Sequence, residues 1–485
     1  MSLPLFFFFS SSFYAFVFQP HTPQHALQTQ GHKHYTSMVK ETVVLDLGRY
    51  VRVGILTEGR CPLAVCTFLR ASSPSLTPHH TPPPTTHSAL IKCGFAGESA
   101  PRHLLLSPLD GWSTQATAQG WGREEWVQAL GPLIVRLLVH HLHVRPRDRK
   151  VLVCELLAGP TAAREALAFV LLDWLKVPAL LVVPSLTLPL YTAGAEGGLV
   201  VDVGFRECHV LAVVFGRPLL HTYTVAGVGA MTVLERAQEL LRKNERKDER
   251  EEEEAEDDLT LATLQDVVLR ACFVPSRSNT DDDTTKPIAY KEESISLILS
   301  PELRITSTEV LFDDNADDGA SLPVALLECL QKCPRDVRRL VAGHVLVTGG
   351  VAMLPGFCRR LAHEVKHHAK VKMRYQELCP LLLGQDGNSP SSSSSSTTTS
   401  SASALCIIRD SALLAPRNVL TWVGGSILGV LAETASPDSS PFVTRESYLA
   451  AAGKEGGKEG EEGRRRCFTP VLSEWLSVAG GGDET

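Results

Sequence analysis

Two short stretches far apart in the chain share one pattern, and this repetition is the strongest constraint on the fold. Residues 43–48 read VVLDLG and residues 199–204 read LVVDVG. Each is an apolar run typical of a strand in a covered sheet, and each ends in an aspartate followed by a glycine that permits close backbone approach to a ligand. A second apolar run follows each motif after a loop. The pair predicts a duplicated α/β core that holds a phosphate tail between two lobes.

The segments around these motifs predict alternating helices and strands. Apolar residues recur at helical spacing over residues 126–138, which predicts a helix packed on a sheet. Pro160 suits the first turn of a second helix, whose apolar stripe extends to Trp174. Strands are also expected over residues 151–156 and 209–215, a helix that opens within residues 227–232, and another over residues 267–273.

Further segments, in order along the chain, resemble the actin family. They are residues 92–98 (KCGFAGE), 155–165 (ELLAGPTAARE), 190–194 (LYTAG), 348–356 (TGGVAMLPG) and 422–428 (WVGGSIL). The resemblance extends from about residue 42 to about residue 450, so the chain is identified as a member of the actin-related protein family. That membership implies an α/β, actin-like (duplicated ribonuclease-H-like) two-lobed fold with a central nucleotide cleft.

The same resemblance implies a nucleotide site built from both motifs. It implies ATP or ADP with Mg²⁺ as a structural cofactor, and Asp46 and Asp202 as the residues that hold the ion through water. The other matching positions are the turn glycines Gly48 and Gly204, the phosphate-contacting Lys92, and the adenosine-side glycines Gly349 and Gly350. The alternative interpretation is that the two aspartates only cap strand ends and that Lys92 is a surface lysine.

Departures from the family pattern affect the chemistry of this site. Residues 49–50 are Arg-Tyr where actin has Ser-Gly, and residues 205–206 are Phe-Arg where it has Asp-Gly. Ser185 falls on the glutamine that orients the hydrolytic water, and without that partner we interpret the matched His209 as a bystander. Because phosphoryl transfer here depends on positioning and electrostatics, we expect no catalytic residues and negligible ATPase activity.

A short span in the first half of the chain suggests a role at a filament end. Residues 108–125 occupy the place of the much longer outer subdomain that the resemblance implies, including the loop that inserts into the next protomer. Filament growth is a head-to-tail contact that continues until an end is blocked. A protomer that lacks half of this contact terminates the filament, so we expect a reduced outer subdomain and a capping function.

Within the family, residues 202–207 (DVGFRE), residues 145–151 (RPRDRKV) and the short segment between Pro108 and Trp126 resemble the subunit that caps the pointed end of the dynactin filament. This resemblance implies a cytoplasmic, cytoskeletal protein that supports dynein-driven microtubule transport, including retrograde axonal transport. Its partners would be the dynactin actin-like filament and pointed-end subunits and, indirectly, dynein and cargo adaptors. Two alternatives stay open: a nuclear subunit of a chromatin remodeller, since residues 251–258 form an acidic insert, and an ATP-hydrolysing member of the actin superfamily.

Composition excludes several other classes of protein. A net charge of −7 without a compensating basic stripe argues against a nucleic-acid partner. Residues 5–18 are apolar but shorter than the roughly 20 residues of a membrane span, so no membrane insertion is expected. The twelve cysteines include no Cys-x-x-Cys pair, which favours buried free thiols over a zinc site.

The chain also divides into expected units. Residues 38–195 are expected to form the outer lobe, residues 196–410 the inner lobe, and residues 411–450 a return to the outer lobe. The other expectations are a disordered or spurious extension over 1–37, a long insert or gene-model artefact over 52–90, a disordered charged insert over 243–258, a Ser-rich loop over 389–403, and a flexible tail over 451–485.

Overall fold

A computed structural model of the chain describes residues 41–47, 90–107, 120–155, 157, 159–248, 261–276, 286–292, 295–313, 321–383, 405–436 and 440–453. Several expectations therefore fall outside the described residues. They concern residues 1–37, Gly48, residues 49–50, the insert at 52–90 apart from Leu90, residues 108–119 and 249–258, the Ser-rich loop at 389–403, and the tail from residue 454.

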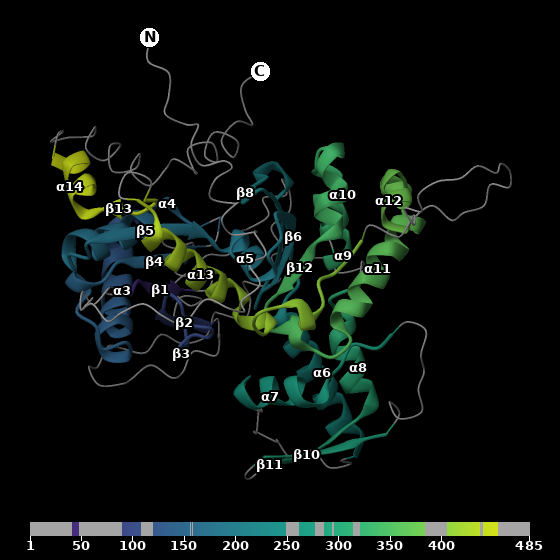
Figure 1. The fold of residues 1–485 in the computed structure, drawn as a ribbon. Coiled ribbons are helices and arrows are strands. Elements are labelled where there is room, and N and C mark those ends of the chain that lie inside the picture. Colours follow the sequence, from purple (N-terminus) through teal and green to yellow (C-terminus); the bar gives the residue numbers. More distant parts are fainter. Residues whose placement is uncertain are drawn as a thin grey trace, which may run out of the picture.

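The outer lobe is built on a six-stranded sheet in the order β13-β5-β4-β1-β2-β3. Alternate side chains of its central strands point to opposite faces: Val43 and Leu45 pack against helices on one face, and Val44 packs with Trp422 on the other. The strands are β1 (Val43–Asp46), β2 (Leu90–Phe95), β3 (His103–Leu106), β4 (Val151–Glu155), β5 (Ala179–Pro184) and β13 (Val443–Thr444). The helices of this lobe are α3 (Arg123–Val135), α4 (Thr161–Ala168), α13 (Leu420–Thr434) and α14 (Arg445–Gly453) (Figure 1).

The inner lobe is built on a second sheet, in the order β12-β6-β7-β8, with β9 paired to β7. Its strands are β6 (Gly197–Val203), β7 (Cys208–Val214), β8 (Arg217–Pro218), β9 (Thr224–Ala226) and β12 (Val345–Thr348). The helices are α6 (Ala230–Asp248), α7 (Leu261–Ala271), α8 (Pro301–Glu309), α9 (Leu322–Lys332), α10 (Arg335–Gly343), α11 (Phe357–Val371) and α12 (Cys379–Leu383). A separate hairpin, β10 (Ile288–Glu292) and β11 (Ile295–Leu299), lies beyond α7 (Figure 1).

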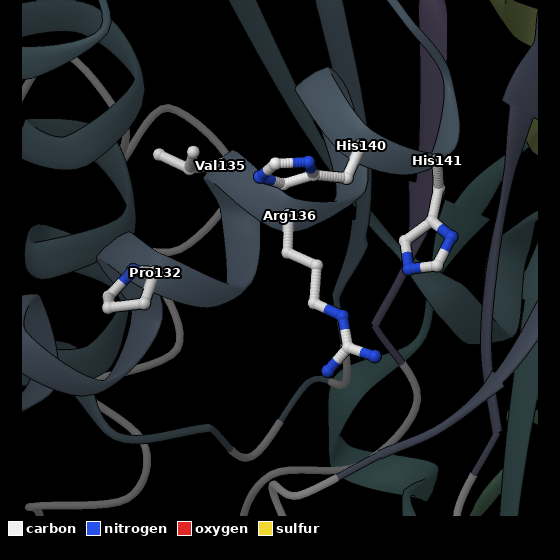
Figure 2. Close-up of a pocket in the computed structure, with 5 residues that line it drawn as sticks. All are labelled: Pro132, Val135, Arg136, His140 and His141. Carbon is white, nitrogen blue, oxygen red and sulfur yellow. The ribbon is translucent and has the colours of Figure 1, made fainter.

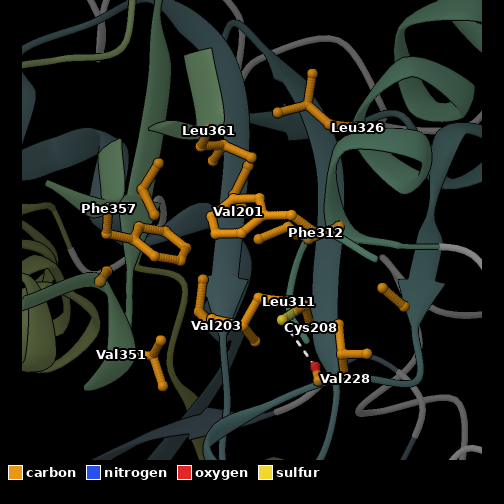
Figure 3. Packing of buried hydrophobic residues seen from close by; sticks show 14 of the residues in the cluster. Val201, Val203, Cys208, Val228, Leu311, Phe312, Leu326, Val351, Phe357 and Leu361 are labelled. Carbon is orange, nitrogen blue, oxygen red and sulfur yellow. Dashed lines mark hydrogen bonds between the residues drawn. The ribbon is translucent and has the colours of Figure 1, made fainter. Parts of the chain in front are cut away.

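The core of the inner lobe forms where strand residues meet the surrounding helices. Figure 3 shows Val201 and Val203 of β6 beside Phe312 and Phe357, whose ring centroids lie 5.9 Å apart. The thiol of Cys208 on β7 donates a hydrogen bond to the carbonyl oxygen of Val228, 2.9 Å away. This packing fixes the sheet whose strand ends form half of the candidate site.

The two sheets repeat one arrangement. In the outer lobe β1 pairs antiparallel with β2 and parallel with β4. In the inner lobe β6 pairs antiparallel with β7 and parallel with β12. Each Asp-x-Gly strand is therefore central between an antiparallel and a parallel neighbour. This repetition confirms the expected duplicated core and the two-lobed α/β fold.

The lobes are joined through α5 (Pro189–Ala193) and α13 (Figure 1). A small apolar cluster contains residues from both sides of the junction, including Leu190, Leu346 and Leu420. Gly424 on α13 lies so close to the chain before α5 that an added Cβ would come within 2.0 Å of the Leu188 carbonyl oxygen. The indole nitrogen of Trp422 donates to the Val44 carbonyl oxygen at 3.2 Å. Gly424 and Trp422 thus pack α13 closely against the chain before α5 and against β1.

Most of the expected elements are confirmed, but two expectations are wrong. Trp174 is 51% exposed instead of buried. The helix widens into a π-helical turn over Phe169–Trp174, so Trp174 no longer follows the 3.6-residue spacing of the apolar stripe. The charged run is not disordered at its start, because α6 continues through Lys243 to Asp248. Glu239 accepts from both Arg236 and Lys243, and such pairs one turn apart stabilise a helix.

Candidate functional site

The outer half of the candidate site lies at the end of β1. The antiparallel register places Lys92 of β2 directly opposite Asp46 of β1. The ammonium nitrogen of Lys92 lies 2.8 Å from Asp46 Oδ2, and both side chains are largely buried. The lysine is therefore no surface residue, which removes the alternative interpretation of this position.

Electrostatics connect this pair to the inner lobe. Burial by itself would lower the pKa of Lys92, but the adjacent Asp46 carboxylate and the charge of Asp202 outweigh it and raise the pKa above its ordinary value of 10.5. Asp202 is thus near enough to act on Lys92 from the other lobe. The fold brings together three of the residues that the two motifs contribute: Asp46, Lys92 and Asp202.

The inner half of the site lies at the end of β6. Asp202 faces His209 of β7 on one side and Thr348 of β12 on the other. Among the described residues, no group of three or more acidic, histidine or cysteine side chains is placed to hold a metal ion. Two carboxylates from opposite lobes fit a hydrated divalent ion, which takes few protein ligands and keeps its water.

The turn after β6 is attached to the start of α6. The amide of Gly204 donates to Glu207 O at 3.2 Å, which closes the turn. The amides of Ala230 and Met231 then donate to the carbonyl oxygens of Gly204 and Phe205, at 3.1 and 2.7 Å. Amides at a helix start often bind phosphate. These two are occupied by the loop itself, so a phosphate would rely on other donors.

His209 is held by partners that the sequence did not reveal. Its Nδ1 lies 2.6 Å from the Tyr223 hydroxyl oxygen, with the rings stacked 5.7 Å apart, and its Nε2 lies 3.9 Å from Glu207 Oε2. The imidazole is fully buried. Tyr223 reaches it through the strand register and the loop before β9, whereas Glu207 lies only two residues before it in the chain. No sequence motif marks either partner. Ser185 lies just beyond β5, and its carbonyl oxygen accepts from the amide of Leu188 at 3.3 Å.

The two glycines expected beside adenosine have different surroundings. Gly349 has φ +110°, and an added Cβ would lie 2.1 Å from the Val203 carbonyl oxygen. Only glycine fits this close approach between the end of β12 and the end of β6. An added Cβ on Gly350 would meet no atom within 4 Å. The open side of Gly350 leaves room for a ligand, whereas Gly349 is required by the fold.

A buried arginine supports this glycine loop, and sequence reasoning missed it. The carbonyl oxygen of Arg417 accepts from the Gly349 amide at 3.1 Å and from the Thr348 hydroxyl at 2.7 Å. Its guanidinium donates to Val347 O, Ile408 O and Asp410 Oδ1 at 2.8, 2.6 and 2.6 Å. Because these partners lie up to 70 positions away in the chain, no local signal could identify the role of Arg417.

The helices of the described part include none with the length and apolar character required to cross a membrane.

Comparison with known proteins then places the chain in a family. The protein-family model described as Actin matches residues 125–448. This span contains the whole inner lobe, α13 and most of the outer lobe, and it begins after the β1–β2 hairpin.

Two curated proteins illustrate the range of relatives. Actin-related protein 10 of Dictyostelium discoideum is 24% identical over 425 residues, which cover 74% of this chain and 84% of that protein. Actin-like protein 7A of Bos taurus is 24% identical over 374 residues, which cover 70% of this chain and 75% of that protein. Together with a family match over more than half of the chain, the duplicated sheets and the paired Asp-x-Gly strand ends show that the chain belongs to the actin family.

Proposed function

We propose that this protein is a non-enzymatic actin-related subunit that caps the pointed end of the dynactin filament and supports dynein-driven transport on microtubules. The observation that supports it most is the length of one connection: only residues 107–122 separate β3 from α3. In actin this connection would include the outer subdomain and its insertion loop. The similarity to actin-related protein 10 agrees with this assignment.

The physical argument concerns the two ends of one protomer. A head-to-tail filament grows because each subunit offers a complementary surface at both ends. The inner lobe and the sheet of the outer lobe are present, so one end can dock on a filament. The shortened connection leaves little chain with which to receive a further subunit, and addition stops there.

For the cleft, we propose structural binding of ATP or ADP with Mg²⁺ and negligible hydrolysis. Lys92 would contact the phosphates, Asp46 and Asp202 would hold the hydrated ion, and the open side of Gly350 would receive the adenosine. Ser185 has a short side chain at the place of the water-positioning glutamine, which removes the group that would orient a nucleophile. The bound nucleotide would act as a bridge between lobes.

The capping proposal is tested with the purified full chain and filaments of the dynactin actin-like subunit. Single-filament fluorescence should show that subunit loss and addition stop at one end only. A matched chimera, in which residues 107–122 are replaced by the corresponding actin segment with its insertion loop, should bind the same end and permit growth. Equal growth with and without the wild-type protein would contradict capping.

A pulldown of the tagged protein, analysed by mass spectrometry, separates the alternatives. Recovery of the dynactin filament and its pointed-end subunits supports the proposal. Recovery of chromatin-remodelling subunits would support the nuclear alternative instead. A steady-state ATPase rate equal to that of filamentous actin would support the enzymatic alternative.

A further inference from the structure

The end of α3 forms a shallow hollow on the outer lobe, and its lining includes none of the candidate-site residues. Here the helix widens into a π-helical turn over Arg136–His141. The hollow has a volume of about 640 Å³ and is lined by Pro132, Val135, Arg136, His140 and His141 (Figure 2). We call it the His/Arg hollow. Its walls combine an apolar side, Pro132 and Val135, with a basic side.

Basic side chains collect at this hollow without acidic neighbours in its lining. Among the described residues, Arg136 has no ion pair and no hydrogen-bond partner for its guanidinium. The ring of His103, on the neighbouring strand β3, lies 5.4 Å from that of His141. His140 and His143 add two further imidazoles, and the lining of the hollow includes no carboxylate. The unpaired guanidinium of Arg136 is an exposed positive charge without a counter-charge, which is typical of a surface that binds the opposite sign.

One polar atom at this place is unsatisfied. The Nε2 atom of His141 is shielded from solvent and has no hydrogen-bond partner among the described residues. Buried polar atoms in proteins nearly always have a partner, so an orphan needs a reason. Figure 2 shows the side chains of Arg136 and His141 extending from the same side of the helix end. A ligand oxygen in the hollow would meet the guanidinium of Arg136, while the shielded Nε2 of His141 is closed to it.

We propose that the His/Arg hollow binds an acidic segment of a partner protein. A carboxylate of that segment pairs with the guanidinium of Arg136, beside the imidazole of His141. An apolar side chain next to the carboxylate packs against Pro132 and Val135. The planar fork of an arginine matches a carboxylate well. The net charge of −7 disfavours a nucleic acid, and an apolar wall favours a peptide over a free anion.

The site is tested with the full-length protein and a fluorescent peptide of alternating glutamate and leucine. Fluorescence anisotropy should show saturable binding that Arg136→Glu weakens by at least about tenfold, equivalent to about 1.4 kcal/mol. Arg359→Glu is the matched control, since Arg359 is an exposed arginine on helix α11 of the other lobe. A peptide with glutamine in place of glutamate should not bind. Circular dichroism checks that each variant folds.

A pH series gives a readout that a purely structural role of the hollow would not produce. Loss of water around the ring, and then the charges of Arg136 and the imidazoles of His103, His140 and His143, lower the pKa of His141. His141 is therefore neutral at pH 7 and gains its charge only on acidification. Peptide affinity should rise as the pH falls below neutral and His141 gains its charge, as long as glutamate is still ionised.

Several outcomes would overturn the proposal. They are equal binding of the glutamate and glutamine peptides, equal binding by the wild type and Arg136→Glu, and no peptide binding up to millimolar concentration. Arg136-dependent binding of anionic lipid vesicles or RNA in preference to the peptide would also overturn it. None of these results depends on filament capping, so the two proposals fail separately.

Discussion

At the scale of single residues, the ammonium group of Lys92 experiences carboxylates from both lobes. It contacts Asp46 directly at 2.8 Å, and the charge of Asp202 acts on it as well. A buried ion pair gives little net stability, but removing one partner leaves the other charge buried and uncompensated. The Lys92–Asp46 pair therefore contributes to the fold of the β1–β2 hairpin, and it also sets the charge near a bound phosphate.

Replacing Lys92 with methionine should lower the free energy of unfolding by about 3 kcal/mol, because Asp46 then stays buried without its partner. Urea unfolding measures the loss, and the double variant Lys92→Met with Asp46→Asn should recover part of it. Lys243→Met, which removes a lysine from an exposed pair with Glu239, is the control and should lower stability only slightly, because an exposed ion pair contributes little. An equal loss of stability in Lys92→Met and Lys243→Met would show that burial of the Lys92–Asp46 pair is not the cause.

The pH dependence of this contribution follows from the direction of the shift. Because the folded-state pKa of Lys92 lies above its ordinary 10.5, the stabilisation is fully present below pH 10.5 and is lost as pH rises through the folded-state value. The difference in unfolding free energy between the wild type and Lys92→Met should therefore be constant around neutral pH and shrink only in strong alkali. A difference that shrinks near neutrality would contradict this assignment.

Cysteine reactivity should follow burial. Burial raises the pKa of Cys93 to about 11 and that of Cys272 to about 12, so these thiols stay protonated at neutral pH. Cys406 is exposed, and all cysteines of the described part are free. Brief iodoacetamide treatment should label Cys406 before the buried cysteines of the described residues, as measured by peptide mass spectrometry, because the thiolate is the reactive form. Similar labelling rates for Cys93 and Cys406 in the folded protein would contradict the packing.

At the scale of elements, the contact between the ends of β12 and β6 depends on one glycine. Gly349→Ala should destabilise the protein by about 2–3 kcal/mol, since the new methyl group would overlap the Val203 backbone at a positive φ. Gly350→Ala is a matched neighbour with open space around its Cβ and should be nearly neutral. Thermal unfolding of the two variants measures the contrast. Equal losses of stability in the two variants would show that any substitution in this loop is destabilising, whatever the contact with Val203.

At the scale of the whole molecule, the cleft residues come from two lobes, so a ligand bound by both should stabilise the folded chain. ADP with Mg²⁺ at a hundred times its Kd should add roughly 2.7 kcal/mol to the free energy of unfolding, by mass action. Differential scanning fluorimetry with increasing ADP tests this. Lys92→Met should reduce the response more than Lys243→Met does. An unchanged melting temperature at millimolar ADP would count against nucleotide binding.

The sequence alone was sufficient for the duplicated strands, several of the helices that pack on them and the family, but not for helices α8 to α12 of the inner lobe. These features follow from short-range patterns: apolar runs, helical spacing and Asp-x-Gly strand ends. Each pattern corresponds to one kind of local backbone structure. The charged composition of residues 243–258 suggested disorder, whereas α6 extends through the start of this run, where Lys243 donates to Glu239 four residues earlier. The short-range patterns also could not place Trp174, because a π-helical turn shifts its face.

Only the tertiary structure decided which of these residues meet. Tyr223 reaches His209 through strand register, Arg417 reaches the loop at Gly349 from a distant segment, and His103 reaches His141 across the edge of a sheet. Such contacts join positions far apart in the chain, and they depend on how two sheets and their helices pack. Local sequence patterns therefore determined the elements and the two halves of the cleft, whereas long-range packing determined the neighbours and charge of each site residue.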